Sequence, residues 1–216
     1  RQRQMCIRDR GYSVDADALY RQASAALNGG GATVQVAVNT VEPTKDSSDV
    51  NGRFGMITQA VTNASSSNKN RLTNLRLACA ALNGYCIQPG ETFSFNQVVG
   101  QRTAKRGYKK ATVYQSGELA EDIGGGVCQV STTLWNAAMK ANCEIVERSE
   151  HSRTVAYVDK GKDATVSWPG QDMKFKNTSS SPMYLVCYVS DNKRVYCEVY
   201  GELFPNCLLY TSPSPR

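Results

Sequence analysis

The last third of the chain is a series of short segments in which apolar and polar residues alternate, and this pattern constrains the fold most. The clearest pair is YLVCYV and RVYCEVY, separated by the turn SDNK. Alternation with a period of two around a polar turn predicts an antiparallel hairpin. With a three-residue loop, Cys187 and Cys197 lie opposite each other and are either core residues or a cross-strand disulfide. Their shared apolar face holds Leu185, Val189, Val195 and Val199.

Four segments before this hairpin have the same character. They are EIVER (144–148), TVAYV (154–158), ATVSW (164–168) and MKFKN (173–177). Short strands at such close spacing are typical of an antiparallel sheet or half-barrel.

Two helices are predicted to cover this sheet. Residues 71–83 place apolar side chains at three- and four-residue steps, after Asn70 as a cap and before Gly84 as a stop. Residues 128–141 have a second apolar stripe, made of Val130, Leu134, Ala137, Ala138 and Ala141. We therefore expect an α+β fold in which two main helices pack on a mainly antiparallel β-sheet.

The remaining chain divides by composition. Residues 1–10 and 206–216 resemble translated sequencing adaptors and are predicted to be artefacts without an ordered role. Residues 11–50 contain a helix at 14–27, a strand at 33–41 and a polar, turn-rich linker from residue 42. This organisation predicts one main domain over residues 51–205.

Charge and motifs exclude several kinds of partner. The two ends contribute five arginines and one aspartate, so without them the formal net charge falls from +6 to +2, which is too weak to indicate nucleic acid. No apolar run reaches the eighteen or so residues of a membrane span. Neither a CxxC nor an HxxxH pair occurs, and the glycines match no nucleotide-binding motif, so we expect neither a metal nor a cofactor.

The segment GGGVCQVSTTLWNAAMKA carries the strongest chemical signal. Three glycines precede Cys128, which opens the second predicted helix, and the N-terminal end of a helix stabilises a thiolate. The exposed backbone of Gly125 and Gly126 predicts N–H donors for an oxyanion. A tight turn, an anion site, or a disulfide from Cys128 to Cys143 or Cys86 are the alternatives.

His151 is the single histidine of the chain, in the segment RSEHSRTVAYV. Imidazole is the side chain whose unperturbed pKa suits proton transfer near neutrality, so His151 is the natural partner of a Cys128 nucleophile. A purely structural histidine is the alternative. The residue that orients the ring is not visible in the sequence, and Asp163 and Asp122 are the two candidates.

At these residues the sequence resembles the VanW family. The matching segments include NRLTNLRLACAALNGYCIQPGETFSFNQVVGQRT, GGGVCQVSTTLWNAAMKA and VERSEHSRTVAYVDKGKDATVSW, and the likeness extends over about residues 53–201. Residues 11–42 resemble the end of the peptidoglycan-binding-like domain that often precedes VanW domains.

The resemblance implies a peptidoglycan L,D-transpeptidase outside the membrane of a Gram-positive bacterium, held there by an N-terminal anchor that this sequence lacks. It implies Cys128 as the nucleophile that forms an acyl-enzyme and His151 as its proton donor, with stem peptides as the partner and 3→3 crosslinks as the product. Gln129, Ser131 and Thr132 are candidates for positioning the stem peptide. A cell-wall cysteine peptidase or carboxypeptidase and a non-catalytic peptidoglycan-binding module are the alternatives.

Overall fold

The structure is a computed structural model that describes residues 11–14, 16–30, 33–34, 38–41, 53–115 and 118–203. The chain divides after Arg53 into two units. Both predicted artefact segments, residues 1–10 and 206–216, lie outside the described residues, as does the linker at 42–52.

The N-terminal unit consists of one helix between two paired strands. Strand β1 (Gly11–Val14) pairs antiparallel with β2 (Val38–Val41), and α1 (Ala16–Asn28) lies between them in sequence. The helix predicted at 14–27 is therefore present. Of the strand predicted at 33–41, residues 38–41 form β2, whereas residues 33–34 are not in a strand.

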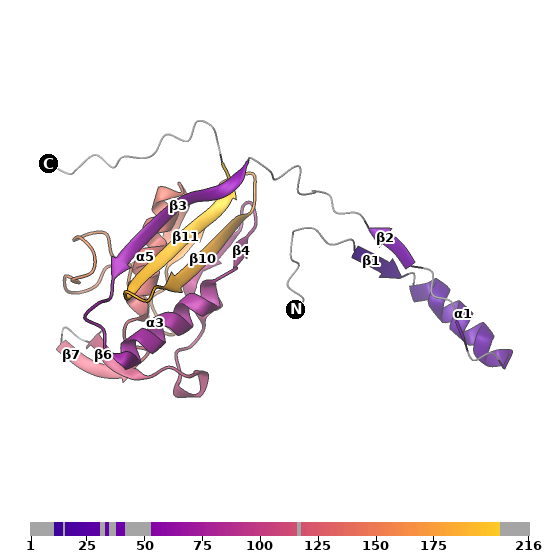
Figure 1. Cartoon of the computed structure of the whole chain (residues 1–216), viewed down its shortest axis with the longest axis horizontal. Helices are drawn as coiled ribbons and strands as arrows, with labels where there is room; N and C mark the ends of the chain where they lie inside the picture. The colour runs from indigo at the N-terminus through magenta and orange to yellow at the C-terminus, as the bar shows by residue number, and fades with distance from the viewer. Residues whose placement is uncertain are drawn as a thin grey trace. The chain divides into compact units, whose positions relative to one another are not determined.

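The C-terminal unit is built on a four-stranded antiparallel sheet with the order β3-β11-β10-β4 (Figure 1). Its strands are β3 (Phe54–Asn63), β4 (Cys86–Ile87), β10 (Met183–Val189) and β11 (Arg194–Glu202). Cys187 pairs with Cys197 in β10 and β11, as the alternation predicted. Both are buried free thiols, so they are core residues and form no disulfide.

Two helices pack on the sheet, which confirms the predicted α+β fold. They are α3 (Lys69–Leu82), capped by the side chain of Asn68, and α5 (Val127–Lys140). Helix α3 packs against β10 and α5 against β3 and β11, and the two helices contact each other. None of the described helices has the length and apolar character that a bilayer crossing requires.

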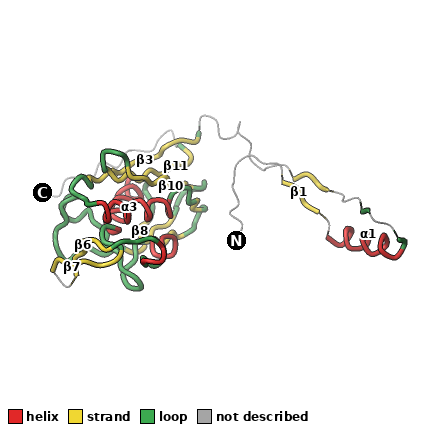
Figure 2. Tube along the Cα trace, turned by 60° about the horizontal axis from the view of Figure 1, so that its bottom comes forward, coloured by secondary structure: helices red, strands yellow, loops and turns green. Residues whose placement is uncertain are grey.

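Smaller elements complete the C-terminal unit, and Figure 2 shows β6 and β7 side by side. A second antiparallel sheet has the order β5-β9-β8, and β6 pairs with β7 in a separate hairpin. The bounds are β5 (Thr92–Ser94), α4 (Phe95–Val99), η1 (Ala104–Arg106), β6 (Lys110–Gln115), β7 (Glu118–Ile123), β8 (Glu144–Glu147) and β9 (Lys174–Lys176).

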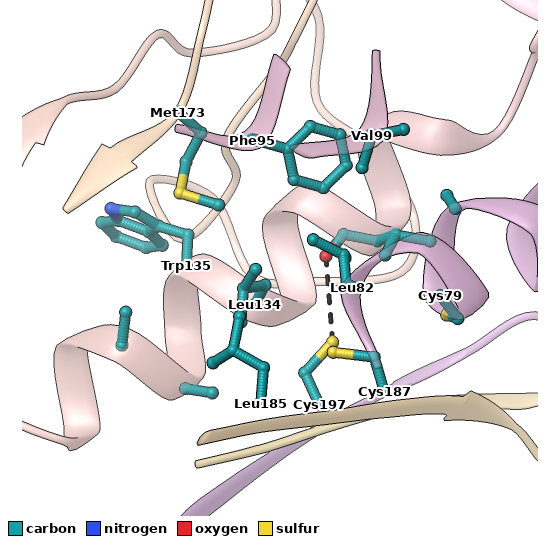
Figure 3. Close-up of a cluster of buried hydrophobic side chains, with 14 of the residues drawn as sticks. Cys79, Leu82, Phe95, Val99, Leu134, Trp135, Met173, Leu185, Cys187 and Cys197 are labelled. Atoms are coloured by element: carbon teal, nitrogen blue, oxygen red, sulfur yellow. Dashed lines mark hydrogen bonds between the residues drawn. The ribbon is translucent and has the colours of Figure 1, made fainter. Parts of the chain in front are cut away.

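The core lies on both sides of the two helices (Figure 3). Leu185 and the paired cysteines of the main sheet contact the helices from one side, and Phe95 and Met173 lie on the other. Leu134 of α5 is buried between them. The two helices are therefore held between two apolar surfaces. This packing fixes the position of α5, and with it the position of its first residues.

Two of the predicted strands are wrong. The segments 154–158 and 164–168 are loops, apart from one bridge between Ser149 and Thr165. The backbone of Ala164 explains the second case, because its N–H and C=O bind hydroxyl groups of α5 in place of a neighbouring strand.

Candidate active site

Helix α5 begins directly after the glycine run. Gly124 and Gly126 have φ angles of +88° and +102°, in the left-handed region that glycine adopts without steric cost. Gly126 is the N-cap residue, and Cys128 follows as the second residue of the helix. The positive φ values therefore turn the chain sharply enough to place Cys128 in the first helical turn.

Each of the three glycines also allows a close approach. A Cβ on Gly124 would lie 2.8 Å from Cβ of Arg102, and one on Gly126 would lie 2.8 Å from Cγ of Arg71. A Cβ on Gly125 would lie 2.4 Å from the backbone oxygen of Ala111 in β6. The glycine run therefore packs closely between strand β6 and the aliphatic parts of the Arg71 and Arg102 side chains.

Cys128 is a half-buried free thiol. Its Sγ atom lies 3.3 Å from the carbonyl oxygen of Val166, to which the neutral thiol donates, and 3.5 Å from Oγ1 of Thr165. His151 lines the same cleft as Cys128, and its side chain interacts with the thiol and helps to lower the pKa of Cys128. The disulfides considered for Cys128 are absent, since neither Cys86 nor Cys143 takes part in a disulfide.

His151 lies between Cys128 and Asp163. Its Nδ1 atom is 2.6 Å from Oδ2 of Asp163, and the same oxygen accepts the backbone N–H of His151 at 2.7 Å. A proton on Nδ1, held by the carboxylate, leaves Nε2 as the ring nitrogen for the thiol. The structure thus brings together the cysteine and histidine that the sequence paired, and adds an aspartate behind them.

The contacts of Cys128 and His151 shift their pKa values in opposite directions. Burial acts to raise the pKa of the Cys128 thiol, but hydrogen bonds with His151 and Thr165 outweigh it and bring the pKa below its usual value. Burial acts to lower the pKa of His151, but its contacts with Cys128 and Asp163 outweigh it and raise the pKa. Both shifts favour a thiolate next to an imidazolium.

Asp163 is itself held in place by Arg148. The guanidinium of Arg148 donates to the backbone oxygen of Asp163 at 2.7 Å, and Nη2 lies 3.4 Å from Oδ1. It also binds the carboxylate of Glu150 at 2.7 Å and stacks on the ring of Trp135 in α5, 4.9 Å from the centroid. Burial acts to raise the pKa of Asp163, but its hydrogen bonds with His151 outweigh this and lower it.

Asp163 is the residue that orients the ring of His151. Asp122, the other candidate, is exposed, and its carboxylate accepts the backbone N–H of Ile123 at 2.7 Å. It does not contact His151. No sequence signal distinguished the two, because the loop that returns Asp163 to α5 has no regular secondary structure.

Three residues predicted to position a substrate have structural roles. Ser131 and Thr132 are fully buried, and their hydroxyls bind the backbone oxygen of Ala164 at 2.7 and 3.2 Å. Gln129 is 2% exposed, and its amide binds Arg71, Thr62 and the backbone oxygen of Asn63. Ser131 and Thr132 therefore attach the segment next to Asp163 to the helix that carries Cys128.

The two glycines predicted to provide oxyanion donors differ from each other. The N–H of Gly125 donates to the backbone oxygen of Asp122 at 3.3 Å, and its own oxygen accepts from Asn74, so that prediction is wrong for Gly125. Among the described residues, no acceptor is found for the backbone N–H of Gly126 or of Cys128. These two groups are available to an oxyanion near the thiol.

An open cleft of about 1020 Å³ gives access to the site. Cys128 and His151 line it together with Arg71, Arg102, Gly126 and Trp168. Trp168 is 44% exposed at this cleft, so it offers an aromatic surface to a ligand. Within the described ranges, no group of three or more His, Cys, Asp or Glu side chains is arranged to hold a metal ion.

These features define an α+β domain in which a helix N-terminus carries a thiol next to a histidine and an aspartate. Residues 70–200, more than half of the chain, match the family described as "VanW like protein", and the chain belongs to this family.

Two curated relatives extend the comparison. The chain is 50% identical over 127 residues to "Uncharacterized protein YoaR" of Bacillus subtilis strain 168, which is 59% of this chain and 42% of that protein. It is 32% identical over 145 residues to "Vancomycin B-type resistance protein VanW" of Enterococcus faecalis V583, 65% of this chain and 52% of that protein. The chain thus spans about half the length of these relatives. No solved structure matches.

Proposed function

We propose that this protein is a peptidoglycan L,D-transpeptidase that forms 3→3 crosslinks through a thioester on Cys128. The observation that carries the proposal is that Cys128 and His151 line one open cleft, with Asp163 bound to Nδ1 of His151 at 2.6 Å. A thiolate at a helix N-terminus with an oriented imidazole is the arrangement that acyl transfer requires. The resemblance of the sequence to VanW domains supplies the substrate class.

Acylation would begin with the thiolate of Cys128. The sulfur attacks the carbonyl carbon of the third stem residue, and the negative charge that develops on the oxygen is stabilised by the N–H groups of Gly126 and Cys128. As the tetrahedral intermediate collapses, the C–N bond breaks, and Nε2 of His151 gives its proton to the departing D-alanine nitrogen. The products of this step are free D-alanine, a thioester on Cys128 and a neutral imidazole.

Transfer would then use the amine of a neighbouring stem. The amine attacks the thioester carbon, Nε2 of His151 takes its proton, and the C–S bond breaks to restore the thiolate. The new amide is the crosslink, and the imidazolium and thiolate are ready for another cycle. The open cleft of about 1020 Å³ is where the amine of the second peptide would be held next to the acyl group.

A location outside the cytoplasmic membrane is part of this proposal, because the substrate lies there. The name of the Enterococcus relative connects that protein with vancomycin resistance. This connection agrees with an enzyme whose substrates are peptidoglycan stem peptides.

Incubation of the purified chain with disaccharide-tetrapeptides, followed by mass spectrometry, tests the proposal. We expect 3→3 dimers and free D-alanine from the wild type, and neither from Cys128→Ala. Cys86→Ala is the matched control, because Cys86 is a half-buried thiol on β4 that does not line the cleft. Tripeptides without dimers would indicate a carboxypeptidase, and unchanged substrate with retained binding would indicate a binding module.

A further inference from the structure

We propose that Arg102 binds the free carboxylate of the substrate's terminal residue, so that the site selects stem peptides ending directly after the scissile bond. This inference rests on the proposed function and adds a specificity-determining residue to it. Neither the motifs of the sequence nor the Cys128–His151 pair indicated this role.

Arg102 lies next to the segment that leads to the nucleophile. Its Cβ and Cγ atoms pack on Gly124, where a Cβ would meet them at 2.8 and 3.2 Å. Arg102 and Cys128 line the same cleft, and they are close enough to interact electrostatically. The guanidinium therefore places a positive charge in the cleft that contains the thiol.

The guanidinium has no carboxylate partner in the described part of the chain. Its Nη1 group donates to Oδ1 of Asn96 at 2.7 Å and to the backbone oxygen of Gly100 at 3.1 Å, and both acceptors are neutral. No ion pair to a described aspartate or glutamate is formed. Asp172 is the acidic group nearby, and its carboxylate already accepts from Ser94 and the backbone of Asn96.

A half-buried arginine without a counter-ion is a site for an anion. Nη1 is occupied, and no described residue accepts from Nε or Nη2. These two nitrogens form the edge of the guanidinium that binds a carboxylate through two parallel hydrogen bonds. The vacant edge of this half-buried guanidinium, at the lining of the cleft, fits a carboxylate ligand.

The guanidinium is also held rigidly. The amide nitrogen of Asn96 donates to the backbone oxygens of Ser167 and Gln171 at 2.8 and 2.9 Å, so its oxygen is fixed toward Arg102. The loop between those two residues carries Trp168. Because the guanidinium is already fixed, it would lose little conformational entropy when a carboxylate binds. Its affinity for the carboxylate is therefore higher than that of a mobile side chain.

The chemistry of the substrate explains why an anion site should lie here. In a tetrapeptide stem, the terminal carboxylate is joined to the scissile carbonyl carbon only through the amide nitrogen and one α-carbon. A residue that binds it must therefore line the same cleft as the nucleophile, as Arg102 does. A pentapeptide would present a neutral amide at this point and lose the charged contact.

Two donors and two variants test this inference. Turnover is measured with the tetrapeptide stem and with its C-terminal carboxamide, using the full chain, Arg102→Gln and Arg102→Lys. The wild type should prefer the acid by roughly 10- to 100-fold in kcat/KM, the range of a charge-assisted hydrogen bond. In Arg102→Gln this preference should fall to about one because only the acid loses affinity, and Arg102→Lys should keep part of it.

Lys105→Gln is the matched control. It removes an equal charge from an exposed lysine on η1 that does not line the cleft, and the preference for the acid should be unchanged. Equal losses for acid and amide in Arg102→Gln would overturn the inference, and would indicate that Arg102 acts on the thiolate. Thermal unfolding of each variant checks that the fold is intact, and the lysine variant serves if the glutamine variant does not fold.

Binding to Cys128→Ala separates this inference from the proposed function. Calorimetry with the acid and the amide measures carboxylate recognition without turnover. Tighter binding of the acid that depends on Arg102, without any turnover by the wild type, would sustain the inference and refute transpeptidation. Dimers formed equally well from both donors would sustain transpeptidation and refute the role of Arg102, and neither binding nor turnover would refute both.

Discussion

One carboxylate oxygen of Asp163 accepts two hydrogen bonds from His151, one from the backbone N–H at 2.7 Å and one from ring Nδ1 at 2.6 Å. Both donors belong to His151, so this oxygen fixes the imidazole ring relative to the backbone of His151. Tyr157 contacts the ring edge-on, with centroids 6.4 Å apart. The tautomer with Nε2 toward Cys128 is thereby favoured before any substrate binds.

Asp163→Asn should therefore reduce kcat by a factor of about 10² to 10⁴, the range for a disturbed general acid–base group. Burial acts to lower the pKa of His151, and Asp163 is one of the two contacts that raise it. Without the carboxylate the imidazolium loses its proton at lower pH, so the alkaline limb of the pH–rate profile should move down. Asp159→Asn, at an exposed carboxylate of the same loop, is the control. An unshifted alkaline limb would contradict the prediction.

The thiolate of Cys128 should depend on His151. In His151→Gln the hydrogen bond and the positive charge that lower the pKa of the thiol are lost, and burial, which raises it, remains. The pKa of Cys128 should rise, and alkylation by iodoacetamide near pH 7 should slow. Peptide mass spectrometry across a pH series follows Cys128 and, as an internal control, Cys86. Identical pH profiles for Cys128 in both proteins would argue against the pair.

The hairpin and the two helices were predictable because one-sided burial leaves a periodic signal. Cys187 opposite Cys197 and the stripe of α5 follow directly from it. Strand β3 was missed although FGMITQAVTN has strand-like composition, since its partner β11 lies at the other end of the chain. Long-range pairing of this kind is not visible in local sequence.

The site was less predictable than the fold. Cys128 carried a local signal because glycines and a helix start surround it, and His151 was the single histidine. Asp163 and Arg102 reach the site through irregular loops, whose positions depend on tertiary contacts. The polar residues after Cys128 suggested an exposed face, whereas Ser131 and Thr132 are buried against the loop of Ala164.

Substitution of Thr132 tests this structural role. Thr132→Val leaves the buried N–H of Ala164 without its acceptor, which should lower the free energy of unfolding by about 1–3 kcal/mol. The loop next to Asp163 would loosen, so kcat should fall more than KM rises. Thr73→Val, at a half-buried position on α3, is the control for the change of side chain in a helix. A rise in KM at unchanged stability would restore the substrate-binding role.

The tight packing of Gly125 leads to a prediction about stability and activity together. Gly125 does not have a positive φ, so alanine suits its backbone, and the cost of Gly125→Ala is steric. The added Cβ would lie 2.4 Å from the backbone oxygen of Ala111 and 2.8 Å from that of Thr112, so β6 and the glycine run must separate. We expect a loss of about 1–3 kcal/mol or more in the free energy of unfolding.

Gly84→Ala is the matched comparison. Gly84 has a φ of +77° but no heavy atom within 4 Å of a built Cβ, so alanine there meets backbone strain alone, about 1–2 kcal/mol. Gly125→Ala should also slow the alkylation of Cys128, because moving the glycine run moves the start of α5, whereas Gly84→Ala should leave that rate unchanged. Denaturant unfolding and the alkylation assay measure the two effects. If Gly125→Ala retained wild-type stability and alkylation rate, the close packing of Gly125 on β6 would not be what positions the thiol.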